Sequence, residues 1–368
     1  MKRRDFLKKA GTTAAVATAA TVVNAPFVHA AKEKKIKWKM VTTWAPKAPY
    51  LQTGAERFAD RVKELTGGKF EIRVYAGGEL VPNLETFQAV STGQVEAGSG
   101  ASYYQAGKEP AAQWFAAVPF GLNAQGMGAW LWAGNGLKLW EETYAPFGVI
   151  PRPCGNTGVQ MGGWFNKEIN SIDDFKGLKM RIPGLGGKVV AKAGGTVVLL
   201  AGAEIFTSLE RGVIDATEWV GPLLDSLKGF YKVAKYYYYP GWHEPGTVLE
   251  NIFNKKAYEA LPKEYQTVLD VATYETWPWM LSGFEADNGA ALEELITKHG
   301  VKLVRFPETV MDSLSKLSAE VLEEEAAKSP MAKKVNEDFK AFKVQVGRWG
   351  EVSEKAYYDL IMAKYKLS

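Results

Sequence analysis

Three residues at the ends of two strand-like runs, Arg181, Glu218 and Trp219, offer the chemistry of carboxylate capture. Arg181 ends the run 178–181, and Glu218 and Trp219 end the run that starts at Val213. An arginine side chain presents a planar fork of N–H donors that matches a carboxylate with two parallel hydrogen bonds. The spacing therefore predicts a site for a small carboxylate, with a purely structural Arg181–Glu218 salt bridge as the alternative.

Other chemistry is excluded by the same kind of reading. The run 183–188 (PGLGGK) has glycines near a lysine, but Ile182 and Val189 stand where a phosphate loop needs Gly and Ser or Thr. Val189 also occupies the third-glycine position of a dinucleotide-binding fingerprint. Neither an HExxH motif nor a GxSxG nucleophile elbow occurs. His243 and Glu244 could form an acid–base pair, although a loop histidine with a satisfied hydrogen bond is the simpler interpretation.

The first 30 residues read as an export signal. Arg3 and Arg4 resemble a twin-arginine motif, an Ala/Thr/Val-rich run follows, and Val28–Ala30 resembles a cleavage site. Removing this segment takes five of the 45 basic and one of the 41 acidic side chains, which leaves no net charge. A balanced chain gives no reason to expect nucleic acid or an anionic membrane as partner.

A single cysteine, Cys154, excludes an intramolecular disulfide, so an exported chain of this kind must rely on its core. The hydrophobic fraction of 46% and the length of 368 residues make a sizeable core available and favour two domains. Two histidines remain after removal of the signal, which is little material for metal or general-base chemistry.

The first half of the chain alternates strand and helix patterns, which predicts a parallel sheet flanked by helices. The expected strands are 36–43, 70–75, 95–100, 147–151 and 159–165, and the expected helices are 50–65, 84–92 and 127–144. A second β/α set follows, with strands at 179–182, 196–200, 213–218, 236–239 and 250–254 and helices at 188–193 and 203–211. The remainder reads as helices at 263–281, 284–299, 307–328 and 338–366.

These elements predict an α/β fold of two lobes, each built on a β/α sheet, with a central ligand cleft and long C-terminal helices. We assign residues 31–157 plus 245–275 to lobe I and residues 158–244 plus 276–345 to lobe II. Residues 346–368 form a C-terminal helix. Ligands of open α/β sheets sit at the carboxyl ends of strands, where Arg181 and Glu218 lie.

Several motifs resemble the extracytoplasmic solute-binding subunits of TRAP (tripartite ATP-independent) transporters, the DctP-like family. The motifs are DFKGLKMR at 174–181, EIFTSLERGVIDATEW at 204–219, TTW at 42–44, EIRVYAGGEL at 71–80 and GQVEA at 93–97. The run YYYYPGWHEPG at 236–246 resembles the branch that binds 2-oxo acids such as pyruvate, or lactate, together with a metal ion. The resemblance covers essentially the whole chain after the signal.

The resemblance assigns roles to individual positions. It implies that Arg181 clamps the ligand carboxylate and that Gln160 touches both ligand and ion. It implies that Glu218, Glu244 and the backbone carbonyl of Trp219 bind the ion. Residues expected near the ligand are Trp219, Asn156 and Tyr103, with Trp44 a weaker choice for the pocket wall.

Oxygen ligands of these kinds suit a hard cation, Na⁺ or Ca²⁺. Two glutamates and a ligand carboxylate against one arginine leave two negative charges, which favours Ca²⁺ because a buried net charge is costly. The resemblance implies a periplasmic, twin-arginine-exported protein that passes a small 2-oxo or 2-hydroxy monocarboxylate to TRAP membrane permease subunits. It also implies a homodimer contact through the C-terminal helix. The alternatives are a ligand-sensing subunit of a signalling receptor and a metal-dependent periplasmic enzyme that uses His243 and Glu244.

Overall fold

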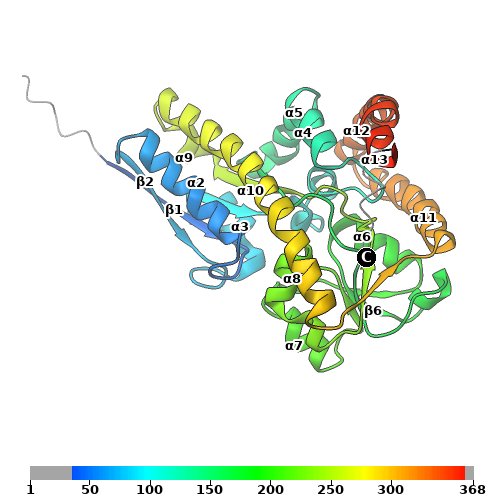
Figure 1. The fold of residues 1–368 in the computed structure, drawn as a ribbon. Coiled ribbons are helices and arrows are strands. Elements are labelled where there is room, and N and C mark those ends of the chain that lie inside the picture. The colour runs from blue at the N-terminus through cyan, green and yellow to red at the C-terminus, as the bar shows by residue number, and fades with distance from the viewer. Residues whose placement is uncertain (1–34, 361–368) are drawn as a thin grey trace, which may run out of the picture. The chain divides into compact units, whose positions relative to one another are not determined.

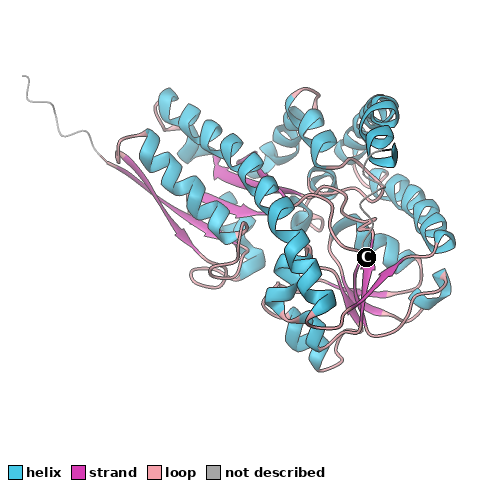
Figure 2. Cartoon of the chain, viewed as in Figure 1, coloured by secondary structure: helices cyan, strands magenta, loops and turns pink. Residues whose placement is uncertain are grey.

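The computed structural model describes residues 35–360, so the predicted export signal and the last eight residues lie outside the described part of the chain. The described strands form two sheets with helices packed on them (Figures 1 and 2). This arrangement confirms the predicted α/β class. Among residues 35–360 no helix combines the length and the apolar character that crossing a membrane requires.

The first sheet has the strand order β2-β1-β3-β10-β4. Its first three strands are parallel, and β10 runs antiparallel to both of its neighbours. The strands are β1 (Ile36–Thr42), β2 (Phe70–Tyr75), β3 (Ala97–Gly100), β4 (Val149–Asn156) and β10 (Val248–Asn254). The helices packed on or near it are α2 (Gln52–Leu65), α3 (Thr86–Ser91), α4 (Ala124–Trp132), α5 (Gly136–Tyr144) and α9 (Lys255–Glu259).

The second sheet has the order β11-β9-β5-β8-β6-β7 and carries the strand ends that matter for function. Its strands are short: β5 (Gly163–Phe165), β6 (Lys179–Arg181), β7 (Thr196–Val198), β8 (Ala216–Thr217), β9 (Tyr236–Tyr239) and β11 (Lys302–Arg305). The helices around it are α6 (Gly184–Lys192), α7 (Ile205–Glu210), α8 (Pro222–Lys228) and α11 (Glu308–Ala326). The chain then ends in α12 (Pro330–Gly350), a π-helical turn (Glu351–Lys355) and α13 (Ala356–Leu360).

The chain passes between the two sheets three times: after β4, between β9 and β10, and through the helix α10 (Lys263–Thr297). Helix α10, drawn in yellow in Figure 1, packs against β4 and α2 and, nearer its C-terminal end, against α8. The described residues form one compact unit, so the lobe boundaries derived from the sequence remain a proposal.

Five predicted elements are wrong in extent. The predicted helices 263–281 and 284–299 are one continuous helix, α10, which keeps Pro278 inside it. Its neighbours explain the continuity: Trp277 packs on Trp132 with ring centroids 4.6 Å apart, and Gly283 leaves room for the ring of Tyr50. These contacts on both sides of Pro278 offset the backbone hydrogen bond that a proline removes.

The predicted helix 127–144 is two helices instead, because Gly134 and Asn135 interrupt it between α4 and α5. The predicted strand 159–165 is a loop up to Gly162, and only Gly163–Phe165 pairs in the sheet. The last predicted helix begins at Pro330 rather than Asp338, because the Ser329 side chain caps it by accepting from the Ala332 amide at 3.0 Å.

Candidate ligand and cation site

The register of two parallel strands places Arg181 beside Glu218. In the pairing of β6 with β8, Arg181 stands opposite Thr217, so Glu218 follows directly beyond the strand end. The Arg181 Nη1 group donates to Glu218 Oε1 and to the Glu218 carbonyl, and Nε donates to the Leu200 carbonyl at 3.2 Å. The Arg181–Glu218 salt bridge, which the sequence left open as the alternative to a carboxylate site, is therefore present in this structure. Adjacent parallel strands deliver both side chains to one edge of the sheet, where they form a direct ion pair.

Trp219 adds an aromatic face to this pair. Its ring centroid lies 5.2 Å from the Arg181 guanidinium carbon and 5.4 Å from the ammonium of Lys228. Trp219 is buried together with Tyr103 and Trp44 in one apolar cluster, which contains residues from both sheets. The ring therefore holds the guanidinium plane in position from one side.

Gln160 and Glu244 come from two loops whose backbones touch. The Gln160 backbone N–H donates to the Glu244 carbonyl at 3.1 Å, and a Cβ added at Gly241 would lie 2.0 Å from the Gln160 carbonyl oxygen. Only glycine permits that approach. Gln160 Nε2 then donates to Glu244 Oε2 at 2.8 Å and to Thr247 Oγ1 at 3.0 Å, and the Thr247 hydroxyl donates to Glu244 Oε2 at 2.5 Å. Because the Gln160 side-chain nitrogen donates to Glu244, the Gln160 side-chain oxygen is left for a different partner.

Asn156, which we expected near the ligand, lies at the end of β4 and hydrogen-bonds to the backbone on both sides of it. Its Nδ2 group donates to the Gly246 carbonyl at 3.1 Å, and its Oδ1 accepts from the Gly158 amide at 2.9 Å. Both ends of the side-chain amide thus bind backbone and join the two segments that pass between the sheets. The structure gives Asn156 a role in positioning the loops of Gln160 and Glu244.

Tyr103 enters from the 3₁₀ turn Ser102–Gln105, which follows the first sheet. A Cβ on Gly184 would lie 3.1 Å from the Tyr103 Cβ, so the tyrosine packs against the first turn of α6, three residues after Arg181. Burial and the nearby Glu244 carboxylate raise the pKa of the Tyr103 phenol well above its usual value. The tyrosine therefore stays neutral and can donate a hydrogen bond.

Buried polar atoms without partners mark the centre of the site. Within residues 35–360, four neighbouring side chains carry buried atoms that make no hydrogen bond: Gln160 Oε1, Arg181 Nη2, Glu218 Oε2, and His243 Nδ1 and Nε2. A buried polar group left without a partner costs about 1–3 kcal/mol, and such groups are rare in native proteins. The cluster therefore presents one cationic donor beside several acceptors, which matches an anion bound together with a cation.

Burial dominates the electrostatics of these groups. It raises the pKa of Glu218 to about 7 against the opposing charge of Arg181. Burial, followed by repulsion from Glu218, raises the pKa of Glu244 to about 7. Burial lowers the pKa of His243 to about 4, so the imidazole is neutral at neutral pH. Two buried carboxylates with raised pKa values thus lie close together, and a bound cation would favour their ionised forms.

The carboxylates of Glu218 and Glu244 and the oxygen of Gln160 fit a hard cation by their chemistry, and Gln160 Oε1 and Glu218 Oε2 also lack hydrogen-bond partners. Potential ligand atoms of Glu218, His243 and Glu244 lie within 4.8 Å of one another. Sequence reasoning named both carboxylates and the glutamine but missed two participants. It considered His243 only as an acid–base partner of Glu244 or as a loop residue, and nothing in the sequence marked Thr247 as the residue that orients Glu244.

A cavity of about 250 Å³ adjoins Trp219. Its other walls come from α8, including Leu224, Leu227 and Lys228, and from the loop 43–51 of the first sheet. The wall is mostly apolar. Lys47 and Lys228 also line it, and of these two Lys228 contacts the Trp219 ring.

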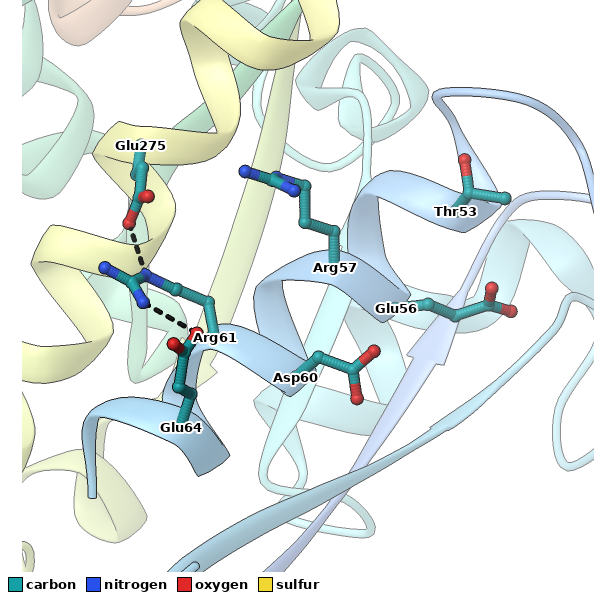
Figure 3. A pocket seen from close by; sticks show the side chains of 7 residues that line it. All are labelled: Thr53, Glu56, Arg57, Asp60, Arg61, Glu64 and Glu275. Atoms are coloured by element: carbon teal, nitrogen blue, oxygen red, sulfur yellow. Dashed lines mark hydrogen bonds and ion pairs between the residues drawn. The ribbon is translucent and has the colours of Figure 1, made fainter. Parts of the chain in front are cut away.

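A second hollow, of about 430 Å³, lies between α2 and α10 and has another character (Figure 3). Charged side chains line it, and Arg61 donates both to Glu64 and to Glu275 at 2.7 Å. The Arg57 guanidinium lies 5.0 Å from the Trp279 ring centroid. These side chains are in contact with solvent as well as with one another. Water can therefore satisfy their polar atoms, unlike the buried polar atoms of the central site.

Comparison with known proteins identifies the class to which the fold and site belong. Residues 40–329 match the model of the bacterial extracellular solute-binding protein family 7, known as DctP. The chain belongs to this family. A monocarboxylate 2-oxoacid-binding periplasmic protein of Nostoc sp. is 47% identical over 363 residues, which cover 97% of this chain and 98% of the relative.

Solved structures share the fold over nearly the whole described chain. A TRAP periplasmic solute-binding protein from Pseudoalteromonas atlantica, with bound sodium and pyruvate, superposes with a TM-score of 0.87 at 41% identity and covers 89% of this chain and 100% of its own. One from Colwellia psychrerythraea, with bound calcium and pyruvate, gives a TM-score of 0.86 at 42% identity, with 89% and 99% covered. The predicted fold class, the α/β periplasmic solute-binding fold, is confirmed.

Proposed function

We propose that this protein is the extracytoplasmic solute-binding subunit of a TRAP transporter and that it captures a small 2-oxo or 2-hydroxy monocarboxylate together with a cation. The observation that carries the proposal is the pairing of an unused guanidinium N–H on Arg181 with unused oxygens on Gln160 and Glu218. The first suits a carboxylate oxygen, and the others suit a cation that also binds the second oxygen of the acid.

In this proposal Arg181 binds the ligand carboxylate and Trp219 supports it. Glu218, Glu244, Gln160 and the Trp219 carbonyl hold the cation, whose chemical contribution is to neutralise the carboxylates and to chelate the acid. Arg181 and the two glutamates already sum to one negative charge, and a ligand carboxylate makes it two. A divalent ion brings the site to neutrality, which favours Ca²⁺ over Na⁺ in a buried setting.

The relatives support the choice of ligand class. The Nostoc relative is named for binding monocarboxylate 2-oxo acids, and the two neighbouring structures contain pyruvate with sodium or calcium. We propose that the cavity beside Trp219 receives the carbon chain of the acid, so that its size sets the preferred chain length. Twin-arginine export to the periplasm and delivery to a membrane permease complete the proposal, and both follow from the family and the N-terminal sequence.

The proposed homodimer contact is supported by the C-terminal helices. Large apolar side chains lie exposed along α12 and the segment that follows it: Val344, Trp349, Val352, Tyr357, Tyr358 and Leu360. Sedimentation velocity of the wild type and of Trp349→Asp tests this contact, because a polar change at a 67% exposed tryptophan alters association and leaves the fold intact.

Thermal unfolding of the metal-stripped protein tests the function. Pyruvate, longer 2-oxo acids, lactate and dicarboxylates are added with Ca²⁺, with Na⁺ or with chelator, and acetate serves as a monocarboxylate without a second oxygen. Ligand binding to the native state raises the melting temperature by mass action. We expect the largest shift with a 2-oxo acid plus Ca²⁺ and little with acetate, which has its two carboxylate oxygens but none on carbon 2. No shift with any 2-oxo or 2-hydroxy acid would contradict the proposal.

A further inference from the structure

Asp225 is a buried carboxylate that the proposed capture of acid and cation does not use. It lies on α8 and is 1% exposed. Its Oδ2 atom accepts from the Trp164 indole N–H at 3.0 Å and from the Tyr237 hydroxyl at 2.8 Å. Its Oδ1 atom accepts from the Val220 backbone N–H at 3.2 Å. A buried carboxylate is costly unless it is hydrogen-bonded, so these three contacts indicate what the side chain holds in place.

The Oδ2 side of the carboxylate is fixed to the second sheet. Trp164 on β5 and Tyr237 on β9 stand opposite each other in the antiparallel pairing of two interior strands. Their rings are fully buried and stacked, with centroids 4.0 Å apart. Two donors that packing holds in place therefore set the position of Asp225 relative to the sheet.

The Oδ1 side holds the peptide unit that joins Trp219 to Val220. This unit is trans, because the cis peptide bond of the described chain is at Tyr239–Pro240. In a planar trans peptide the N–H and C=O groups point in opposite directions. The hydrogen bond from the Val220 N–H to Asp225 therefore turns the Trp219 carbonyl away from Asp225.

The carbonyls on either side of Trp219 are already bound. The Glu218 carbonyl accepts from the Thr217 hydroxyl at 2.8 Å. The Val220 carbonyl accepts from the Met161 N–H at 3.1 Å. The Trp219 carbonyl, by contrast, accepts no hydrogen bond from the described residues. An unused carbonyl oxygen next to Glu218 suits a hard cation.

We infer that Asp225 is a positioning residue for the cation: it does not touch the ion, but it holds the Trp219–Val220 peptide so that the Trp219 carbonyl oxygen stays available to the ion. A hydrogen bond from a peptide N–H to a carboxylate also polarises the C=O of the same peptide, so its oxygen becomes a stronger cation ligand. The inference rests on the proposed function, in which the Trp219 carbonyl binds the cation.

Calcium binding by Asp225→Asn tests this role. Asparagine keeps one oxygen for the two donors at Oδ2 but places an NH₂ group against the Val220 N–H, so that contact is lost. Metal-stripped protein is titrated with Ca²⁺ in a calorimeter at pH 8, above the pKa of about 7 to which burial raises the Asp225 carboxyl. Groups that orient metal ligands typically change metal affinity by about 10- to 100-fold, so we expect a loss of about tenfold or more.

Glu250→Gln is the matched control. Glu250 is also a buried acid that accepts from a tyrosine hydroxyl, that of Tyr144 at 3.0 Å, but it lies on β10 in the first sheet. We expect its change to an amide to leave Ca²⁺ affinity within about threefold of the wild type. Wild-type Ca²⁺ affinity in Asp225→Asn, or an equal loss in both variants, overturns the inference.

Nuclear magnetic resonance of a single peptide separates positioning from a general loss of stability. Trp219–Val220 is the only Trp–Val pair in the sequence, so ¹³C in tryptophan carbonyls and ¹⁵N in valine amides select this peptide alone. We expect Ca²⁺ to shift the Trp219 carbonyl resonance of the wild type. In Asp225→Asn the Val220 amide proton should move upfield, and the carbonyl shift caused by Ca²⁺ should shrink. A wild-type carbonyl resonance that Ca²⁺ leaves in place overturns the inference, and that measurement does not depend on how well the variant folds.

Pyruvate binding separates this inference from the proposed function. If the wild type binds pyruvate with Ca²⁺ and Asp225→Asn binds Ca²⁺ equally well, the inference fails and the function stands. If Asp225→Asn shows the expected loss of Ca²⁺ affinity but the wild type binds no 2-oxo acid, the inference is supported while the proposed capture of the acid fails.

Discussion

Two arginines of this protein each contact a glutamate, and they behave in opposite ways. Arg61, in the hollow between α2 and α10, has a side chain 32% exposed and pairs with Glu64 and Glu275. Arg181, in the central site, is 1% exposed and pairs with a Glu218 side chain that is fully buried. Water can satisfy whatever the partners of Arg61 leave open. Arg181 and Glu218 must find every partner within the protein or in a ligand, so their unused atoms indicate what binds there.

The comparison also predicts energies. An exposed pair contributes about 0–1 kcal/mol to stability, whereas removing one partner of a buried pair costs about 3–5 kcal/mol because a charge stays buried alone. We therefore expect Arg181 to matter for both ligand binding and stability, and Arg61 to contribute little to either. The following experiments test that difference, from the largest effect to the smallest.

Replacement of Arg181 by alanine should have the largest effect. We expect urea unfolding to show a loss of about 3–5 kcal/mol, because the Glu218 carboxylate is left without its counter-ion. Calorimetry with pyruvate and Ca²⁺ should detect no binding, since the donor for the ligand carboxylate is gone. The double change Arg181→Met with Glu218→Gln removes both charges and should recover most of the stability without recovering binding. Pyruvate binding by Arg181→Ala within threefold of wild type would reduce Arg181 to a structural residue.

The stability of the ligand-free protein should fall as pH rises. Burial raises the pKa of Glu218 and Glu244 from the ordinary 4.5 to about 7, and those of Asp225 and Glu250 to about 7 and about 8. Groups with a raised folded-state pKa contribute stability below the unfolded pKa and lose it as pH climbs through the folded one. His243, with its pKa lowered to about 4, acts in the opposite sense between about 6.5 and 4 and offsets part of the slope.

Urea unfolding at pH 5, 6, 7 and 8 checks this slope, for which we expect a net fall of several kcal/mol between pH 5 and pH 8. Saturating Ca²⁺ and pyruvate should remove the share of Glu218 and Glu244, because a bound cation favours their ionised forms. The share of Glu250, which accepts from the Tyr144 hydroxyl at 3.0 Å in the first sheet, should persist and disappear in Glu250→Gln. A slope that ligand and cation leave unchanged would place the titrating groups outside the central site.

A methyl group added at Gly202 should disturb the site through Trp219. The added Cβ would lie 2.3 Å from the Trp219 ring, so the ring must move away from its place beside Arg181. Overpacking of this kind costs about 1–3 kcal/mol, and we expect pyruvate affinity to fall about tenfold in calorimetry.

Gly289→Ala is the matched control for that substitution. A Cβ at Gly289, within α10, meets no described atom within 4 Å, so alanine should stabilise the helix by about 0.5–1 kcal/mol and leave affinity unchanged. Equal affinity of Gly202→Ala and the wild type would show that the position of the Trp219 ring does not matter for binding.

Arg61→Ala should have the smallest effect. Its two ion pairs are partly exposed, so we expect the free energy of unfolding to change by no more than about 1 kcal/mol and pyruvate affinity to stay the same. Repeating the unfolding in 1 M salt should shrink even that difference, because salt screens exposed charges. A tenfold loss of affinity would show that the hollow between α2 and α10 communicates with the central site.

The sequence predicted the positions of charged residues better than their partners. Strand patterns end at Arg181 and Glu218, and their place at one sheet edge follows from parallel pairing. That the two would touch directly depends on register, which the patterns do not contain. The sequence also could not predict that His243 is buried without hydrogen-bond partners, because its position depends on the close approach of the backbone at Gly186, which no local motif encodes.

Element lengths failed for a related reason. Pro278 looks like a helix end, but aromatic packing on both sides of it keeps α10 continuous. The apolar run around Gln160 looks like a strand, but the contact at Gly241 makes it a loop. In both cases tertiary contacts outweighed local preference.

The direct contact between Arg181 and Glu218 has a thermodynamic consequence. An acid that binds both terminal nitrogens of the guanidinium finds Nη2 free but must compete with Glu218 for Nη1, and a cation that draws Glu218 to itself lessens that competition. Acid and cation should therefore bind with positive cooperativity, and reciprocity requires each to raise the affinity of the other by the same factor. Such coupling selects against simple carboxylates. An anion without an oxygen on carbon 2 cannot chelate the cation, and so it does not help the cation to draw Glu218 away from Arg181.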